Sequence, residues 1–326
     1  MRRSMTGLSM AMCVLLAAGA VQAQTAYPSR PVRMVVTFPP GGSSDLIARI
    51  ISPPLAERLG KPVLVENRPG ASGAIGAEVT AKAAPDGHVL MIAGTSSVMG
   101  LNSFLIPNLP YDPKDLAPIT LLVTSPFIVA VNTAMLPSGS VKELLSMLKA
   151  KPQSLSFGSG GSLSGMHLAG EYFKSMFKLD LQHVGYKGNG PALSDLAGGQ
   201  IPMVFVDLGS TGPYVKSGKI KILAVAAAQR TPLAPDIPTT AEAGLPSWEA
   251  LGSFGLFTTA GTPPDVINRV NSEVTRILRQ SDVRDRILVT GNEPAPNTPD
   301  EFSGFIKSEV SKWIRVIKES GIKIEQ

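Results

Sequence analysis

The fold is decided by the stretch VRMVVTFPPGGSSD, residues 32–45. The apolar run Val32–Phe38 predicts a buried strand, and apolar residues that recur at helical spacing over 46–59 predict the helix that follows. Gly41 and Gly42 lie between them, where bare backbone N–H groups can approach an anion at the positive end of the helix. The pattern therefore indicates a turn that holds a small anion.

Groups that could transform such an anion are scarce. A phosphate-binding loop needs Gly-Lys-Ser/Thr, whereas Gly60-Lys61 is followed by Pro62. The glycine-rich run 158–163 lacks the third glycine of a dinucleotide fingerprint, and no Gly-x-Ser-x-Gly elbow occurs. No metal-type spacing links the three histidines, which are His88, His167 and His183. The sequence predicts neither a cofactor nor a metal.

The first 23 residues are typical of a secretory signal peptide. Arg2 and Arg3 form the basic start, Met10–Ala20 is a short apolar core, and Val21-Gln22-Ala23 resembles a cleavage site. A retained signal anchor and a lipid-anchored form are the alternatives. The single cysteine, Cys13, lies inside this segment, so the exported chain would have no disulfide or thiolate chemistry. We expect a periplasmic location.

Length and charge exclude further classes. A chain of 326 residues suits two domains. The formal net charge of +5 falls to +3 when the two arginines of the signal peptide are removed. Lys and Arg are scattered rather than clustered, so we expect no nucleic-acid partner.

Strands and helices alternate along the chain, which predicts an α/β fold with parallel sheets. A second α/β unit follows Thr124, and the chain then returns to the first. We expect one domain from 24–124 plus 228–326 and a second from 125–227. Pro53 and Pro54 should bend or interrupt the first helix. The expected strands are Val32–Phe38, Val63–Glu66, His88–Ala93, Phe127–Asn132, Leu155–Phe157, Leu181–Val184, Met203–Val206 and Ile220–Ala226.

Four polar turns follow expected strands, two in each domain. They cover residues 38–45, 94–97, 157–164 and 186–190. Because ligands of open α/β sheets bind at the carboxyl ends of strands, the four turns could face one another across a cleft. Each turn alone is also explained as an ordinary loop.

Three titratable residues near these turns have two interpretations each. Asp45 could simply stabilise the dipole of the first helix. His167 could face a ligand, or could pack or cap a helix. Asp207 follows a strand, and its carboxylate would repel an anion unless the ligand also carries an amine or a protonated group.

An ordered series of motifs runs through the whole exported chain. It comprises Tyr27-Pro28-Ser29-Arg30-Pro31-Val32-Arg33, Phe38-Pro39-Pro40-Gly41-Gly42-Ser43-Ser44-Asp45, Val65-Glu66-Asn67-Arg68-Pro69-Gly70-Ala71-Ser72-Gly73, Ala84-Pro85-Asp86-Gly87, Leu109-Pro110-Tyr111-Asp112-Pro113, Tyr186-Lys187-Gly188 and Ala260-Gly261-Thr262-Pro263-Pro264. In this order the motifs resemble the Bug family, the extracytoplasmic solute receptors of tripartite tricarboxylate transporters.

The resemblance implies a periplasmic binding protein of type II, with two Rossmann-like α/β domains joined by crossing strands and a hinged ligand cleft. It implies a monomer that closes around a small carboxylate, such as a dicarboxylate, a tricarboxylate or an acidic amino acid, and delivers it to membrane permease subunits. Carried onto this sequence, the ligand-binding positions are Phe38, Gly41, Gly42, Ser43, Asp45, Thr95, Ser96, Ser97, Ser159, Gly161, His167, Tyr186, Gly188 and Asp207.

Several positions depart from the pattern of the family. Gly165 and Met166 replace a frequent Thr and Ser, and Ser253 replaces a frequent tryptophan. Fewer hydroxyl donors and a thioether favour a less polar carboxylate. Two other functions remain open: an exported enzyme with an acid or base among the acidic residues and His167, and a ligand sensor for a signalling partner.

Overall fold

The opening strand and helix form at the expected place. β1 (Val32–Val36) is almost wholly buried, and α2 (Ser43–Leu59) begins after Gly42 and ends at Gly60, which adopts a left-handed conformation with φ 72°. The expectation that prolines would interrupt this helix is wrong, because α2 runs through Pro53 and Pro54. Its apolar face is buried against the sheet, and that packing outweighs two missing backbone donors.

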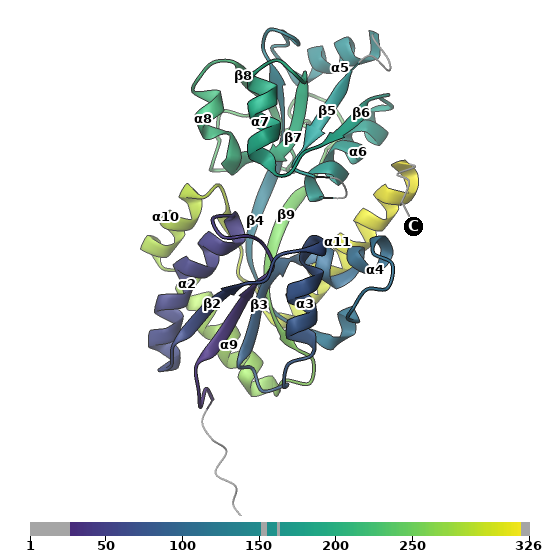
Figure 1. Cartoon of the computed structure of the whole chain (residues 1–326). Helices are drawn as coiled ribbons and strands as arrows, with labels where there is room; N and C mark the ends of the chain where they lie inside the picture. The colour runs from purple at the N-terminus through teal and green to yellow at the C-terminus, as the bar shows by residue number, and fades with distance from the viewer. Residues whose placement is uncertain (1–26, 151–154, 162–163, 321–326) are drawn as a thin grey trace, which may run out of the picture.

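The computed structural model describes residues 27–150, 155–161 and 164–320. They form two lobes joined at a waist (Figure 1). The paired strands follow the order β2 (Val63–Asn67), β1, β3 (Val89–Gly94), β9 (Leu251–Thr259), β4 (Leu116–Asn132), β7 (Met203–Asp207), β5 (Ser156–Ser159) and β6 (Gln182–Gly185). Two further strands, β8 (Ile220–Val225) and β10 (Glu293–Pro294), also pair with β4.

The first lobe is built on β2 (Val63–Asn67), β1 and β3 (Val89–Gly94), which pair in parallel as predicted. Two apolar clusters pack on its sheet. One includes side chains of α2, α9 (Pro264–Leu278) and α10 (Ser281–Val289). The other includes side chains of α3 (Ala74–Ala81) and of the start of α11 (Pro299–Ser320). Its shorter elements are η1 (Ala71–Gly73), η2 (Ser97–Leu101), α4 (Asn102–Leu105), η3 (Pro113–Asp115) and β10 (Glu293–Pro294).

The second lobe repeats this plan. β6 (Gln182–Gly185), β5 (Ser156–Ser159) and β7 (Met203–Asp207) pair in parallel, and β8 (Ile220–Val225) completes the sheet. Its helices are α5 (Val141–Ala150), α6 (Gly165–Phe177), α7 (Asn189–Ala197), α8 (Gly212–Val215) and the short η4 (Leu208–Thr211).

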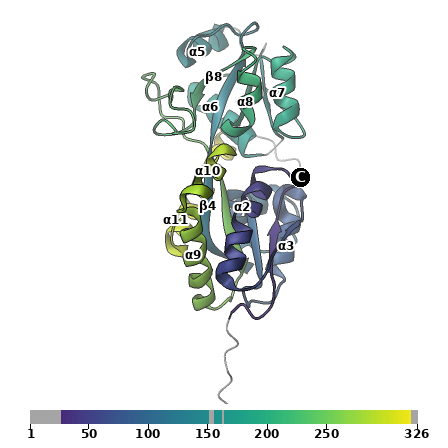
Figure 2. The same ribbon diagram turned by 90° about the vertical axis from the view of Figure 1, so that its left-hand side faces the viewer.

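Two strands cross the waist between the lobes. β4 (Leu116–Asn132) pairs with β9 (Leu251–Thr259) over its first part and with β7 and β8 over its last six residues. Both strands can be followed from one lobe to the other in Figure 1 and in the turned view of Figure 2. The expected α/β fold with crossing strands is confirmed. The strand expected at Phe127–Asn132 is the end of a much longer one.

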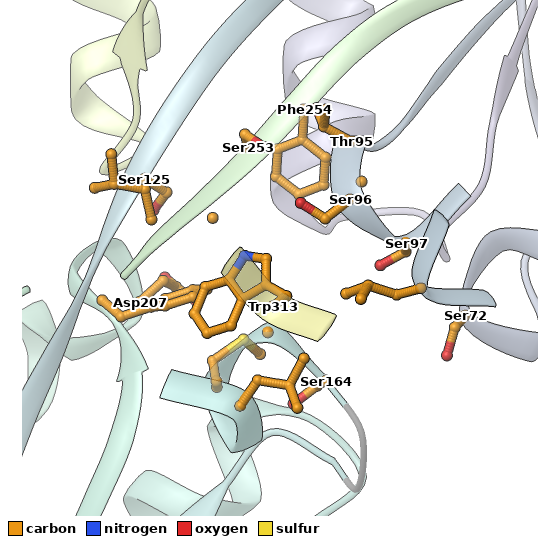
Figure 3. A pocket seen from close by; sticks show the side chains of 18 of the residues that line it. Ser72, Thr95, Ser96, Ser97, Ser125, Ser164, Asp207, Ser253, Phe254 and Trp313 are labelled. Atoms are coloured by element: carbon orange, nitrogen blue, oxygen red, sulfur yellow. The ribbon is translucent and has the colours of Figure 1, made fainter. Parts of the chain in front are cut away.

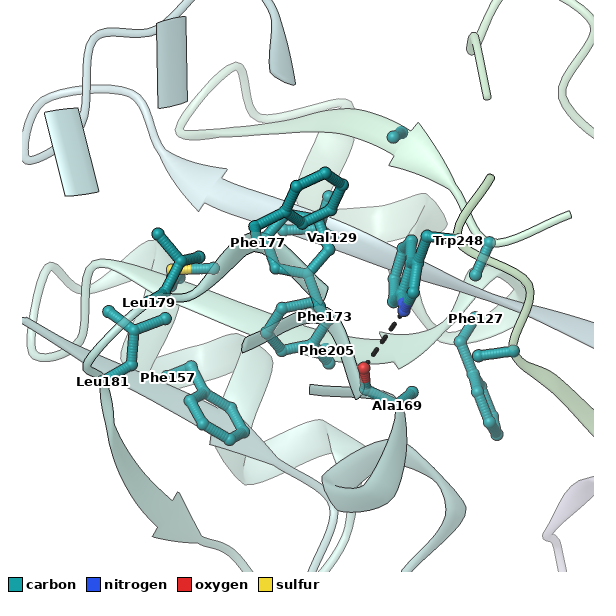
Figure 4. Close-up of a cluster of buried hydrophobic side chains, with 14 of the residues drawn as sticks. Phe127, Val129, Phe157, Ala169, Phe173, Phe177, Leu179, Leu181, Phe205 and Trp248 are labelled. Carbon is teal, nitrogen blue, oxygen red and sulfur yellow. Dashed lines mark hydrogen bonds between the residues drawn. The ribbon is translucent and has the colours of Figure 1, made fainter. Parts of the chain in front are cut away.

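The division between lobes differs in two places from the expected boundaries. Trp248, expected in the first domain, is fully buried in the second lobe, where its Nε1 donates to the Ala169 carbonyl at 3.1 Å (Figure 4). The end of α11 also packs there, with Trp313 edge-on to Tyr172 of α6 at 6.4 Å. α11 therefore spans both lobes (Figure 1).

Candidate functional site

A cavity of about 220 Å³ lies at the waist, between the lobes (Figure 3). It is lined from the first lobe, the second lobe, the two crossing strands and α11. The lining residues are Phe38, Ser43, Ser72, Gly94, Thr95, Ser96, Ser97, Leu101, Ser125, Phe127, Ser164, Gly165, Met166, Leu168, Asp207, Leu251, Gly252, Ser253, Phe254 and Trp313.

Three helices direct their N-terminal ends at this cavity. Ser43 is the first residue of α2, Ser97 opens η2, which continues into α4, and Gly165 is the first residue of α6. The first N–H groups of a helix have no acceptor within the helix, and the helix dipole makes this end partially positive. Convergence of three such ends favours an anionic group in the cavity.

Hydroxyl groups add to these backbone donors. Thr95 is 1% exposed, and its Oγ1 has no hydrogen-bond partner among the described residues. A buried hydroxyl without a partner is unfavourable, so this group is suited to a ligand oxygen. Figure 3 shows Ser96 and Ser97 beside Thr95 on the same side of the cavity.

Ser72 reaches the cavity through an unusual turn. It adopts a left-handed conformation with φ 52°, and its carbonyl accepts a hydrogen bond from Asn102 Nδ2 at 3.2 Å. Left-handed backbone is unfavourable for a residue with a side chain, and such strain clusters at ligand sites.

The second lobe contributes a helix start and an acid. Ser164 caps α6, since its Oγ accepts from the His167 N–H at 3.2 Å. Asp207 caps η4, and its Oδ1 accepts from the backbone N–H and hydroxyl of Ser210 at 3.0 and 2.8 Å. Its Oδ2 accepts from Asn189. Among the residues that the structure describes, Asp207 is the only ionisable one that lines the cavity.

Much of the remaining wall is apolar. The ring of Phe127 fills the space beside two glycines: a methyl group at Gly165 or Gly252 would lie 3.0 or 3.1 Å from it. Phe254 packs edge-on against Phe38 at 5.8 Å. The cavity thus combines helix ends and hydroxyls with an aromatic and aliphatic wall, as in sites for small organic ligands.

Of the residues predicted to bind ligand, six line the cavity: Phe38, Ser43, Thr95, Ser96, Ser97 and Asp207. Gly41, Gly42, Asp45, Ser159, Gly161, His167, Tyr186 and Gly188 are not among its lining residues.

Asp45 organises the turn of residues 38–45, from which an anion site was predicted. The buried carboxylate of Asp45 accepts from the Gly41 N–H at 3.0 Å, from Arg49 Nε at 2.9 Å and from Asn67 Nδ2 at 2.9 Å. Burial acts to raise the pKa of this carboxyl, but these hydrogen bonds and the Arg49 charge outweigh it and hold the pKa at about 2. The Gly41 donor is therefore occupied within the protein, and Gly42 is exposed.

Ser159 and His167 belong to a histidine pair behind the cavity. The rings of His167 and His183 stack at 3.6 Å, and His183 Nε2 lies 2.8 Å from Ser159 Oγ. Glu171 Oε1 is 3.7 Å from His167 Nε2. Burial, and then the neighbouring His167, lower the pKa of His183 to about 4.

The other second-lobe candidates lie in loops next to the cavity. The Tyr186 hydroxyl donates to Asp195 at 2.9 Å, the Gly188 N–H donates to the Gly160 carbonyl at 3.0 Å, and the Gly161 N–H lies 3.3 Å from Ser159 Oγ.

The residues of the waist were not predicted from the sequence. Ser125, Phe127 and the run Leu251–Phe254 lie in the crossing strands β4 and β9, of which only the end of β4 was expected to be a strand, and Trp313 is far away in sequence. Ser164 could have been found, because a serine after a glycine-rich turn and before a helix is a typical N-cap.

Two features are absent from the residues that the structure describes. No helix there is long and apolar enough to cross a membrane. No group of three or more His, Cys, Asp or Glu side chains there is arranged to hold a metal. The signal peptide predicted at residues 1–23 lies outside the described residues.

Comparison with known proteins gives the family. Residues 47–322 match the family described as tripartite tricarboxylate transporter family receptor, TctC. The chain is 34% identical to protein BugT of Bordetella pertussis over 309 residues, which cover 94% of each chain.

Two solved structures resemble the fold closely. A Rhodopseudomonas palustris protein with adipate has 32% identity and a TM-score of 0.81, with 91% of this chain and 99% of that one covered. MatC of Rhodopseudomonas palustris with bound malate has 33% identity and a TM-score of 0.75, with 89% and 100% covered. Family members are solute-binding receptors rather than enzymes. The chain therefore belongs to the tripartite tricarboxylate transporter receptor family and is a solute-binding protein of the Bug type.

Proposed function

We propose that this protein captures a small carboxylate in the periplasm and delivers it, as a monomer, to the membrane permease subunits of a tripartite transporter. The observation that carries the proposal is the convergence of three helix N-termini and the buried Thr95 hydroxyl on one cavity between two lobes. Solved structures of similar proteins with adipate and with bound malate support the ligand class.

Main-chain dipoles and hydroxyls would hold the carboxylate. Hydrogen bonds to a charged group contribute about 1.5–3 kcal/mol each, so a few of them, less the cost of closing the lobes, are enough for micromolar binding at about −8 kcal/mol. Because the donors come from both lobes, bound ligand would bridge them and favour the closed form, which the permease would recognise.

The first test compares a carboxylate with its neutral isostere. Thermal shift of the purified exported protein is measured with benzoate and benzamide, hexanoate and hexanamide, adipate and malate. A ligand at 100 times its Kd should stabilise the folded protein by about 2.7 kcal/mol. We expect at least one acid to stabilise and its amide not to. Stabilisation by none of the acids would contradict the proposal.

A negative charge introduced among the hydrogen-bond donors of the cavity tests where the carboxylate binds. Ser96→Asp puts a carboxylate beside the N-terminus of η2, where it should repel the ligand and lower affinity by at least tenfold. Ser146→Asp adds the same charge at an exposed position of α5 and should leave affinity unchanged. Equal affinity of both variants, measured by calorimetry, would place the carboxylate elsewhere.

A further inference from the structure

The charges that line the cavity are unbalanced. Within the described part of the chain, no Lys, Arg or His lines the cavity, and the one ionisable group there is the carboxylate of Asp207. Two of the three helix ends, with the hydroxyls at Ser43 and Thr95–Ser97, lie in the first lobe. The second lobe adds the start of α6 at Gly165 and the carboxylate of Asp207, which ends β7. A ligand that spans the cavity therefore meets uncharged donors in both lobes but a negative charge only in the second.

The groups that donate hydrogen bonds to Asp207 are uncharged, so they do not cancel its negative charge. Ser210 and Asn189 supply its hydrogen bonds, and none of the ion pairs among the described residues involves it. A second carboxylate on the ligand would face this charge without a cation in the cavity wall, which is unfavourable at low dielectric. An ammonium group would be attracted to this charge, but it would have to share oxygens that already accept three hydrogen bonds.

The surface near Asp207 suits an apolar group better. In the view of Figure 3, Trp313 lies between Asp207 and Ser97, and Phe254 lies beside Thr95 and Ser96. Phe127, Met166 and Leu251 extend this wall. Burying CH₂ groups or a ring against it is favourable in proportion to the apolar area removed from water.

We propose that the ligand of this receptor has a single carboxylate on an apolar body, and that Asp207 is the residue that excludes a second carboxylate. The inference rests on the proposed function and narrows it, since it separates this chain from similar proteins whose structures were solved with the dicarboxylates adipate and malate.

Three six-carbon probes differ only in the terminal group and test the inference. Hexanoate ends in a methyl group, adipate in a second carboxylate and 6-aminohexanoate in an ammonium group. We expect calorimetry of the exported protein to find hexanoate bound at least tenfold more tightly than adipate, and 6-aminohexanoate no more tightly than hexanoate. Tighter binding of either adipate or 6-aminohexanoate than of hexanoate would overturn the inference.

The role of Asp207 is tested by Asp207→Asn. Asparagine is also a good N-cap, so it can still accept a hydrogen bond from the Ser210 N–H. The Oδ1 atom of Asn189 has no partner among the described residues. The Asn189 amide can turn so that this atom accepts a hydrogen bond from the new side-chain amide. We expect the tenfold preference for hexanoate over adipate to shrink to about threefold or less. Asp180→Asn removes an exposed charge before β6, away from the cavity, and should leave the preference intact. An unchanged ratio in Asp207→Asn would overturn the role of this residue.

The outcomes also separate the inference from the proposed function. If adipate or malate binds and hexanoate does not, the inference fails while carboxylate capture stands. If no acid binds, both fail.

Discussion

Asp45 couples the first turn to the sheet. Its carboxylate joins the Gly41 backbone, Arg49 on the next turn of α2 and Asn67 at the end of β2. Asn67 also donates to the Phe38 carbonyl at 3.1 Å, so the same network positions a residue that lines the cavity. Asp45 therefore supports the site from outside it.

Asp45→Ala should lower the free energy of unfolding at pH 7 by about 1–3 kcal/mol, because a buried charged acceptor with three donors is lost. The folded pKa of about 2 lies below the unfolded value of 3.8, so this contribution is complete above pH 4 and disappears as the pH falls towards 2. Urea unfolding at pH 7 and pH 3 measures it. Asp265→Ala, an exposed acid in the first turn of α9, is the control. Equal losses in both variants would contradict this role.

At the scale of elements, α6 is joined to β5 and β6 by the histidine pair. His167 lies on the first turn of α6, His183 on β6, and Ser159 at the end of β5. Glu171 and Lys174 of α6 are the charged groups on this cluster, and Phe157 packs on both imidazoles. Because the start of α6 lines the cavity, protonation of this cluster would disturb the second-lobe side of the site.

Stability should therefore decline as the pH falls from 6.5 towards 4. His183 is neutral in the folded protein down to about pH 4 but binds a proton near pH 6.5 when unfolded, so lowering the pH through this window favours the unfolded state. His183→Gln should flatten the dependence of Tm on pH between 6.5 and 5, where the carboxylates are still ionised. If Tm of His183→Gln depends on pH as steeply as that of the wild type, the pH dependence does not come from His183.

At the scale of the whole molecule, α11 and the crossing strands connect ligand to lobe arrangement. α11 starts on the first lobe with Phe302 and ends on the second with Trp313, whose Nε1 donates to Glu309 at 3.1 Å. Trp313 also lines the cavity, whereas Trp248 is buried in the second lobe (Figures 3 and 4). Trp313 is thus the tryptophan placed to respond to ligand.

Binding should change the intrinsic fluorescence through Trp313 alone. With the carboxylate that gives the largest thermal shift, we expect Trp248→Phe to keep the ligand-dependent change and Trp313→Phe to lose most of it. Trp313→Phe keeps an apolar ring but loses the hydrogen bond from Nε1 to Glu309. Loss of this hydrogen bond should lower the free energy of unfolding by about 1 kcal/mol. Loss of the signal in Trp248→Phe instead would contradict the location of the cavity.

The sequence by itself determined the α/β class, α2, the end of β4 and the strands β1–β3 and β5–β8, whereas β9 was not predicted. These predictions follow from local rules, namely apolar periodicity and glycine at turns. The order of motifs further indicated the family and the cavity positions from Ser43 to Ser97.

Only the tertiary structure decided which donors face the cavity. The Gly41 donor is taken by Asp45, while Ser125, Ser253 and Trp313 reach the site from strands and a helix whose local patterns indicate only burial. The length of β4 and the placement of Trp248 in the second lobe were also decided there. The physical reason is that a cavity between lobes is formed by contacts distant in sequence, and local patterns encode the elements rather than the faces those elements present to one another.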